Sequence, residues 1–256
     1  MAGHNARVVL PDPLAPPTLY GRVRESRVLE GLLGAARERG DALVLVGEPG
    51  IGKSSLIAAA AAKARASGFQ ILTATGVQSE AEIPFAGLHQ LMRALQGELD
   101  SLPSPQRQAM LAAFGRTSSA APDRFLIALA ALDLLSDAAA HSPLLVIAED
   151  AQWLDRPTCD VLTFVARRLE SDPITLLMAV REGSQSALLN AGLTELHLDR
   201  LPEPDAAALL DACAPRLSAE MRRRVLQEAR GNPLALVELP ASFRADDLRD
   251  DMGMGC

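Results

Sequence analysis

The sequence contains few cysteines and few aromatic residues. Its three cysteines, Cys159, Cys213 and Cys256, are widely separated and odd in number. This arrangement argues against a disulfide framework and lacks the spacing of a zinc site, so it predicts a reduced, cytosolic chain. With one Trp, one Tyr and six Phe, the core must be built from Ala, Leu and Val, and the hydrophobic content of 48% is ample for one.

Long apolar runs and an excess of positive charge are also absent. No hydrophobic stretch approaches the roughly 18 residues of a membrane span, and the N-terminus lacks the apolar segment of a signal peptide. The net charge is −7 and the isoelectric point about 5.2, which disfavours a nucleic-acid-binding surface. We therefore expect a soluble, cytoplasmic protein with no membrane partner and no direct binding to nucleic acid.

A glycine-rich motif is the most informative feature of the chain. Residues 47–54 match the phosphate-binding pattern G-x-x-x-x-G-K-[ST], after an apolar run at 42–46 and before a helix-favouring stretch at 56–66. Glycines let the backbone wrap closely around a phosphate, and the helix that follows adds its positive dipole end. We predict that these residues bind a nucleotide: Gly47, Glu48, Pro49, Gly50, Ile51, Gly52, Lys53, Ser54 and Ser55.

Two residues of this loop have predicted chemical roles. Lys53 should reach the β- and γ-phosphates, and the Ser54 hydroxyl should ligate Mg²⁺. Of the 25 basic residues, only Lys53 and Lys63 are lysines. Lysine carries a compact point charge that suits a phosphate, so its presence at position 53 of an arginine-rich chain favours a phosphate-binding role. The alternative is that codon bias explains the arginines and that this lysine was retained by accident.

An acidic pair follows a second apolar run. Residues 144–148 precede Glu149 and Asp150, and a strand end of this kind can hold Mg²⁺ and position the attacking water. We predict that Glu149 is the metal-side group and Asp150 the base, with a solvated pair as the alternative. Arg181 ends a third apolar run, residues 174–180, where it is either a group that stabilises transferred charge or an ordinary surface residue.

Apolar runs alternate with segments of helical periodicity along the chain. Strands are predicted at 42–46, 70–75, 144–148, 174–180 and 195–198, and helices at 25–39, 56–66, 85–95, 123–140, 157–169, 205–213 and 218–229. Pro103 and Pro105 are expected to interrupt the region between the third and fourth helices. This alternation predicts an α/β fold with a parallel sheet covered by helices on both faces.

Four segments are expected. Residues 1–18 contain four prolines and should form a flexible arm, and residues 19–200 should form the nucleotide-binding domain. Residues 201–240 carry helical patterns without further strands and should form a partial helical lid. Residues 241–256 are polar and end in Gly and Met, which predicts a disordered tail.

Five segments together resemble a known family. They are LYGR with Glu25 (19–25), GEPGIGKSSL (47–56), LLVIAEDAQWLD (144–155), LLMAVRE (176–182) and ARGNPLALVELP (229–240). They are similar to the N-terminal ATPase of large ATP-binding LuxR-type transcriptional regulators, in the STAND branch of AAA-like P-loop NTPases. The resemblance implies a P-loop NTPase three-layer sandwich with strand order 5-1-4-3-2. It also implies ATP and ADP with Mg²⁺, and a switch set by nucleotide exchange and slow hydrolysis.

The resemblance also assigns residues outside the phosphate loop. Gly21 and Arg22 resemble a motif beside the nucleotide, and Pro233 resembles the lid proline that lies near the adenine. Glu149 stands where the family commonly has Asp, so direct metal ligation is an open point. Family members continue into a sensor region and a C-terminal helix-turn-helix that these 256 residues do not contain. We therefore expect the switch module alone, as a truncated product or a fragment.

The same segments are compatible with other functions. A self-sufficient AAA-type ATPase would self-associate with nucleotide and need an arginine from a neighbouring subunit, for which Arg167 and Arg168 are candidates. The same module from a nucleotide cyclase or another signalling protein would differ only outside these residues. A GTPase is disfavoured because the sequence contains no N-K-x-D motif.

Overall fold

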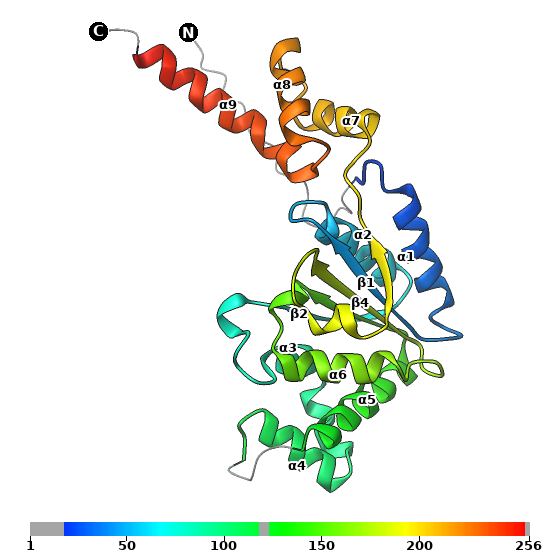
Figure 1. The fold of residues 1–256 in the computed structure, drawn as a ribbon. Coiled ribbons are helices and arrows are strands. Elements are labelled where there is room, and N and C mark those ends of the chain that lie inside the picture. The colour runs from blue at the N-terminus through cyan, green and yellow to red at the C-terminus, as the bar shows by residue number, and fades with distance from the viewer. Residues whose placement is uncertain (1–17, 118–122, 254–256) are drawn as a thin grey trace, which may run out of the picture.

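The computed structural model describes the backbone of residues 18–117 and 123–253. The predicted flexible arm therefore lies outside the described residues, except for Thr18. Figure 1 shows a twisted sheet in the middle of the molecule, a thick helical layer on one side of it and a separate helical group near the C-terminus. No helix within the described ranges combines the length and the apolar character that a membrane crossing requires.

The sheet has five parallel strands. They are β1 (Asp41–Gly47), β2 (Gln70–Thr75), β3 (Leu144–Glu149), β4 (Ile174–Arg181) and β5 (Thr194–His197). Their spatial order is β2-β3-β4-β1-β5, which confirms the expected order 5-1-4-3-2. Since parallel strands end at the same edge of a sheet, the residues that follow β1, β3 and β4 meet there.

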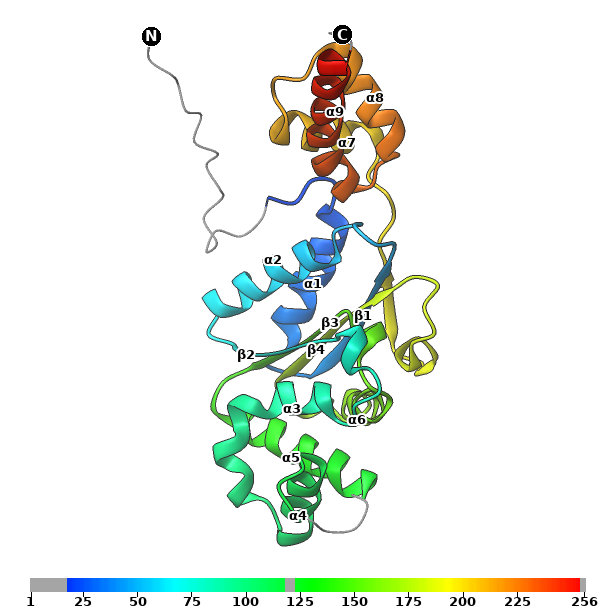
Figure 2. The same cartoon turned by 90° about the vertical axis from the view of Figure 1, so that its left-hand side faces the viewer.

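Helices cover both faces of the sheet, as the two views agree (Figures 1 and 2). One face carries α1 (Val23–Ala35) and α2 (Lys53–Ala66), and the other carries α3 (Ala86–Met92), α5 (Arg124–His141) and α6 (Arg156–Ala166). Successive side chains of a strand point to opposite faces. Leu43 and Leu45 therefore pack in the core beneath α1 and α2, whereas Val44 and Val46 pack in the core beneath α3, α5 and α6. The three-layer α/β architecture is thereby confirmed.

The region around Pro103 and Pro105 differs from the sequence expectation. The predicted helix 85–95 ends as α3 at Met92 and continues as a 3₁₀ helix (Arg93–Ser101). A further helix, α4 (Ser104–Ala113), follows directly and places Met110 in the core. Pro105 stands in its first turn, where a missing N–H costs no helical hydrogen bond. The two prolines therefore mark where α4 starts and do not interrupt helical structure.

A small helical lid follows the sheet. It consists of α7 (Glu203–Cys213), α8 (Ala219–Ala229) and α9 (Pro233–Gly253), and it has a hydrophobic core of its own. The sequence suggested a disordered tail from residue 241, whereas α9 continues to Gly253; residues 254–256 lie outside the described part. Within this stretch Phe243 is only 8% exposed in the lid core, and the Arg224 guanidinium lies 4.2 Å from its ring centroid.

Candidate functional site

The phosphate loop connects β1 to α2 at the carboxyl edge of the sheet. β1 ends at Gly47 and α2 begins at Lys53, so the loop is short and its ends are fixed by buried elements. Gly50 (φ +74°) and Gly52 (φ +101°) adopt left-handed conformations, which a side chain at Cβ would strain. The pattern of glycines in the sequence is therefore required by the backbone path of this loop.

Lys53 folds back over the loop that it follows. Its Nζ donates hydrogen bonds to the carbonyls of Gly47 (2.7 Å) and Glu48 (2.9 Å). Burial lowers the pKa of the Lys53 ammonium from 10.5; the Asp150 and Glu182 carboxylates act in the opposite direction, and Arg181 lowers it further. The loop thus holds a half-buried cation against two carbonyls, which phosphate oxygens can replace as acceptors.

The two residues of the acidic pair lie in different surroundings. Glu149 ends β3, is half-buried and does not line the cavity described below, whereas Asp150 is exposed and does. Asp150 also has a left-handed backbone (φ +46°). Such a conformation costs a non-glycine residue of the order of 1–3 kcal/mol and is concentrated at functional sites. Asp150 is consequently the carboxylate that the fold turns towards Lys53.

Gln152 is a site residue that the sequence analysis did not single out. Its Nε2 donates to Asp150 Oδ1 (3.1 Å), and its Oε1 accepts from the backbone N–H of Arg181 (3.0 Å). The short 3₁₀ turn Ala151–Trp153 brings the amide back to the carboxylate that precedes it. The only signal in the sequence is an amide two residues after the acidic pair.

Arg181 and Trp153 complete the wall beside Asp150. Arg181 is the exposed last residue of β4 and pairs in register with Gly47, the first residue of the phosphate loop. Both Arg181 and the half-buried Trp153 line the cavity. The strand order therefore places the predicted charge-stabilising arginine beside the loop lysine and the carboxylate.

Arg22 supports the phosphate loop from the N-terminal side. It is only 5% exposed, and its Nη2 donates to the carbonyl of Ile51 (2.8 Å) while its Nη1 contacts Glu25 Oε1 (3.3 Å). Gly21, which precedes it, has a φ of +63° and lies against Asp205 of the lid. Arg22 also lines the cavity, so its predicted place beside the nucleotide is compatible with a supporting role.

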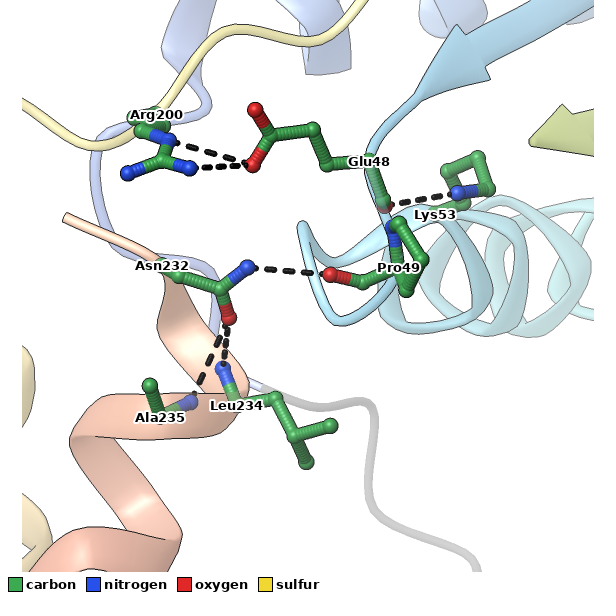
Figure 3. A network of polar contacts seen from close by, with 7 residues as sticks. All are labelled: Glu48, Pro49, Lys53, Arg200, Asn232, Leu234 and Ala235. Atoms are coloured by element: carbon green, nitrogen blue, oxygen red, sulfur yellow. Dashed lines mark hydrogen bonds and ion pairs between the residues drawn. The ribbon is translucent and has the colours of Figure 1, made fainter. Parts of the chain in front are cut away.

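The lid motif contacts the phosphate loop directly, as Figure 3 shows. Asn232 Nδ2 donates to the carbonyl of Pro49 (2.9 Å), and the N–H of Leu234 donates to the carbonyl of Gly50 (3.1 Å). Asn232 Oδ1 accepts from the N–H groups of Leu234 and Ala235 and so caps α9. One asparagine therefore both starts the last lid helix and binds the loop.

An ion pair joins the same two parts of the chain. Arg200, just before the lid, donates from Nη2 (2.7 Å) and Nε (3.1 Å) to Glu48 Oε2. Figure 3 shows the Arg200 and Glu48 side chains extending towards each other between the segment before the lid and the phosphate loop. The two side chains are 46% and 40% exposed, so the pair contributes at most about 1 kcal/mol. The pair therefore adds one weak contact between the segment before the lid and the phosphate loop.

Asp155 is the last residue of the segment that contains the acidic pair (144–155), and it does not line the cavity. It is 2% exposed and accepts four hydrogen bonds, from the N–H groups of Phe85, Gly87 and Thr158 and from the Thr158 hydroxyl. It thereby caps α6 and fixes the start of α3 at once. Its role is structural.

These elements enclose a cavity of about 570 Å³ between the sheet edge and the lid. Seven of the nine predicted loop residues, 49–55, line it; Gly47 and Glu48 do not. Its polar residues include Thr18, Arg22, Lys53, Ser54, Ser55, Asp150, Gln152 and Arg181. Its apolar residues include Leu19, Leu201, Leu209, Pro233, Leu234 and Val237, with Tyr20 beside them. A cavity with one charged and one apolar part suits a ligand that combines phosphates with a flat base.

The fold and this cavity together define the class of the protein. A five-stranded parallel sheet in the order found here, with a phosphate loop after β1 and a carboxylate after β3, is a P-loop nucleotide-binding domain. The sequence profile of the AAA ATPase domain matches residues 18–179. The chain belongs to the AAA ATPase domain family.

Several solved structures have a similar fold. A RuvB variant of Thermotoga maritima has a TM-score of 0.54 at 16% identity, over 91% of this chain and 66% of its own. The Walker-type ATPase paby2304 of Pyrococcus abyssi has a TM-score of 0.54 at 18% identity, over 93% and 74%. A chain of the HORMA:CdnC:Trip13 complex of E. coli MS115-1 has a TM-score of 0.52 at 15% identity, over 82% and 73%. At these identities the likeness shows the fold alone. No curated protein matches the sequence.

Proposed function

We propose that this chain is an ATP-binding switch module with slow hydrolysis, of the type found in LuxR-type transcriptional regulators. The observation that carries the proposal is the direct bonding of the lid to the phosphate loop through Asn232 and Leu234. A ligand that rearranges the backbone at Pro49 and Gly50 must also alter these lid contacts. Nucleotide state is thereby converted into lid position, which is what a switch requires.

The charged part of the cavity would hold the phosphates and Mg²⁺. Lys53 would pair with the β- and γ-phosphates, and the Ser54 hydroxyl would be a metal ligand. Among the described residues no group of three or more His, Cys, Asp or Glu could hold a metal, which fits Mg²⁺ because this ion is bound by few protein ligands together with phosphate oxygens and water. When bound, Mg²⁺ would neutralise phosphate charge.

The residues after β3 and β4 would carry the chemistry. Asp150, which faces the cavity, would orient the attacking water, and Arg181 would stabilise charge on the transferred group. Glu149 does not line the cavity, so we assign it the outer role of acting on the metal through a water molecule. Hydrolysis by these groups would be slow until the lid and its partner regions set the geometry.

The apolar part of the cavity would hold the adenine. Pro233, Leu234 and Val237 of α9 line it together with Leu19 and Tyr20, so the base would contact both the N-terminal segment and the lid. Competition against a fluorescent ATP analogue tests this assignment. ATP and ADP should displace the analogue far better than GTP, and equal displacement by GTP would refute it.

The regulator setting rests on the sequence resemblance, which implies sensor and helix-turn-helix regions in addition to this module. A self-sufficient AAA-type ATPase is the second candidate, because the chain belongs to the AAA family. Its candidate arginines are engaged within the chain: Arg167 Nη2 donates to the carbonyl of Ala191 (2.7 Å), and the Arg168 guanidinium lies 3.6 Å from the ring centroid of Phe164. Gel filtration with and without ATP separates the two, since a ring-forming ATPase would elute as a large assembly.

A further inference from the structure

Gln152 occupies a bridging position between the two strand ends that carry the reactive groups. Its amide donates to the Asp150 carboxylate and accepts from the Arg181 backbone N–H, across 29 residues of sequence. It is half-buried and lines the cavity. A glutamine amide is the side chain that offers a donor and an acceptor at this reach, and both are used here.

The bridge continues into the phosphate loop. The residue after Arg181, Glu182, donates its backbone N–H to the carbonyl of Gly47 (3.0 Å). The same carbonyl accepts the hydrogen bond from Lys53 Nζ (2.7 Å). A continuous path of hydrogen bonds and one peptide unit therefore runs from the Asp150 carboxylate through Gln152 and the end of β4 to the Lys53 ammonium.

Asp150 needs such a restraint. It is exposed and follows the last residue of β3 in a left-handed turn. The terminal torsion of an aspartate is broad, so the direction of an exposed carboxylate is poorly fixed by its own rotamer. Gln152 is the side chain that the structure shows hydrogen-bonded to the Asp150 carboxylate, and a misplacement of about 1 Å can cost a reaction 10²-fold.

We propose that Gln152 is a positioning residue for ATP hydrolysis, acting through Asp150. Its donor half orients the carboxylate, and its acceptor half holds that carboxylate in fixed relation to the end of β4 and to Lys53. This inference rests on the proposed function, because it assigns Asp150 the water-orienting role. It adds a residue that the resemblance does not assign.

Two substitutions separate the halves of the amide. Gln152→Glu keeps the shape and an acceptor for the Arg181 N–H, but an ionised carboxylate donates nothing to Asp150. Gln152→Ala removes both bonds. If the donor half matters, both variants should lose single-turnover hydrolysis by about 10–100-fold, while the ATP dissociation constant changes by less than about threefold. Gln108→Glu, an exposed position on α4, is the matched control and should behave as the wild type.

A merely structural role gives a different result. Gln152→Glu would then be rescued relative to Gln152→Ala, with wild-type turnover and melting temperature, and that outcome would overturn the proposal. Combination with Asp150→Asn adds a second check. If Gln152 acts through Asp150, the double variant should hydrolyse ATP no more slowly than Asp150→Asn alone. Fully multiplicative losses would contradict the inference.

A measurement without turnover keeps the inference separate from the proposed function. ADP with aluminium fluoride and Mg²⁺ mimics the transferred phosphoryl group, and its affinity relative to ADP alone can be measured by calorimetry. Both Gln152 variants should lower this ratio about tenfold or more. A wild type that binds ATP but never hydrolyses it would refute the ATPase role, whereas an unchanged ratio in both variants would refute the role of Gln152.

Discussion

Asn232 of the lid donates a hydrogen bond to the Pro49 carbonyl of the phosphate loop, across 183 residues of sequence. The bond joins the beginning of α9 to the loop that holds Lys53. Because the same side chain caps α9, a change at the loop is transmitted to the start of a helix and not merely to a flexible linker. This contact is the structural basis of the proposed switch.

Lys53→Ala should weaken ATP binding by about 1–3 kcal/mol, the usual contribution of a charged hydrogen bond. Isothermal calorimetry measures the change. Lys63→Ala is the matched control. Lys63 is the other lysine of the chain, and it forms an exposed ion pair between α2 and Glu30 of α1. Unchanged affinity in Lys53→Ala would show that the loop does not bind the phosphates.

Asn232→Asp separates the two functions of that residue. An aspartate still caps α9 through its carboxylate oxygens, but it cannot donate to Pro49. Loss of the bond from Asn232 to Pro49 should make hydrogen exchange about tenfold faster at the Leu234 amide, because one hydrogen bond contributes roughly 0.5–1.5 kcal/mol. Exchange is measured over residues 229–240. ADP release should accelerate in parallel. Asn190→Asp, an exposed position in the short 3₁₀ helix Ala187–Asn190, should change neither; unaltered exchange in Asn232→Asp would argue against coupling between lid and loop.

Asp150→Asn and Glu149→Gln should impair the protein differently. The first keeps its shape and removes a charge, so ATP and Mg²⁺ should bind while single-turnover hydrolysis falls about 10²-fold or more. The second should mainly weaken the Mg²⁺ dependence of nucleotide binding. A magnesium titration and a hydrolysis assay on both variants check the assignment. Wild-type turnover in Asp150→Asn would disprove its role as base, and identical defects would leave the two carboxylates with one shared role.

Cys159 should resist alkylation in the folded protein. It is 3% exposed, and burial, with smaller contributions from Asp155 and Asp160, raises the pKa of its thiol to about 12. At pH 8 only about one thiol in 10⁴ is then ionised, and the thiolate is the reactive form. Cys213 is exposed and should be labelled first. Mass spectrometry of peptides after iodoacetamide treatment tests this, and labelling of Cys159 before Cys213 would contradict the packing of α6.

The agreement between sequence and structure is best where the information is local. The phosphate loop, residues 47–54, is a contiguous segment, and its glycines at 50 and 52 have left-handed angles that favour glycine. Strands β1, β3 and β4 were equally readable, since each is an almost continuous apolar run that is buried in the sheet. The strand order could not come from periodicity, because nothing in one strand specifies its neighbour; the family resemblance supplied it.

The sequence by itself determined which residues form the phosphate loop, because that chemistry lies within eight consecutive positions and one helix start. It also placed Asp150 and Arg181 at strand ends, since an apolar run shows where it stops. Only the tertiary structure decided that Gln152 joins these two ends, that Asp150 and not Glu149 faces the cavity, and that Asn232 binds Pro49. These contacts depend on how separate segments are brought together, and hydrogen bonds between distant segments leave no periodic pattern in the sequence.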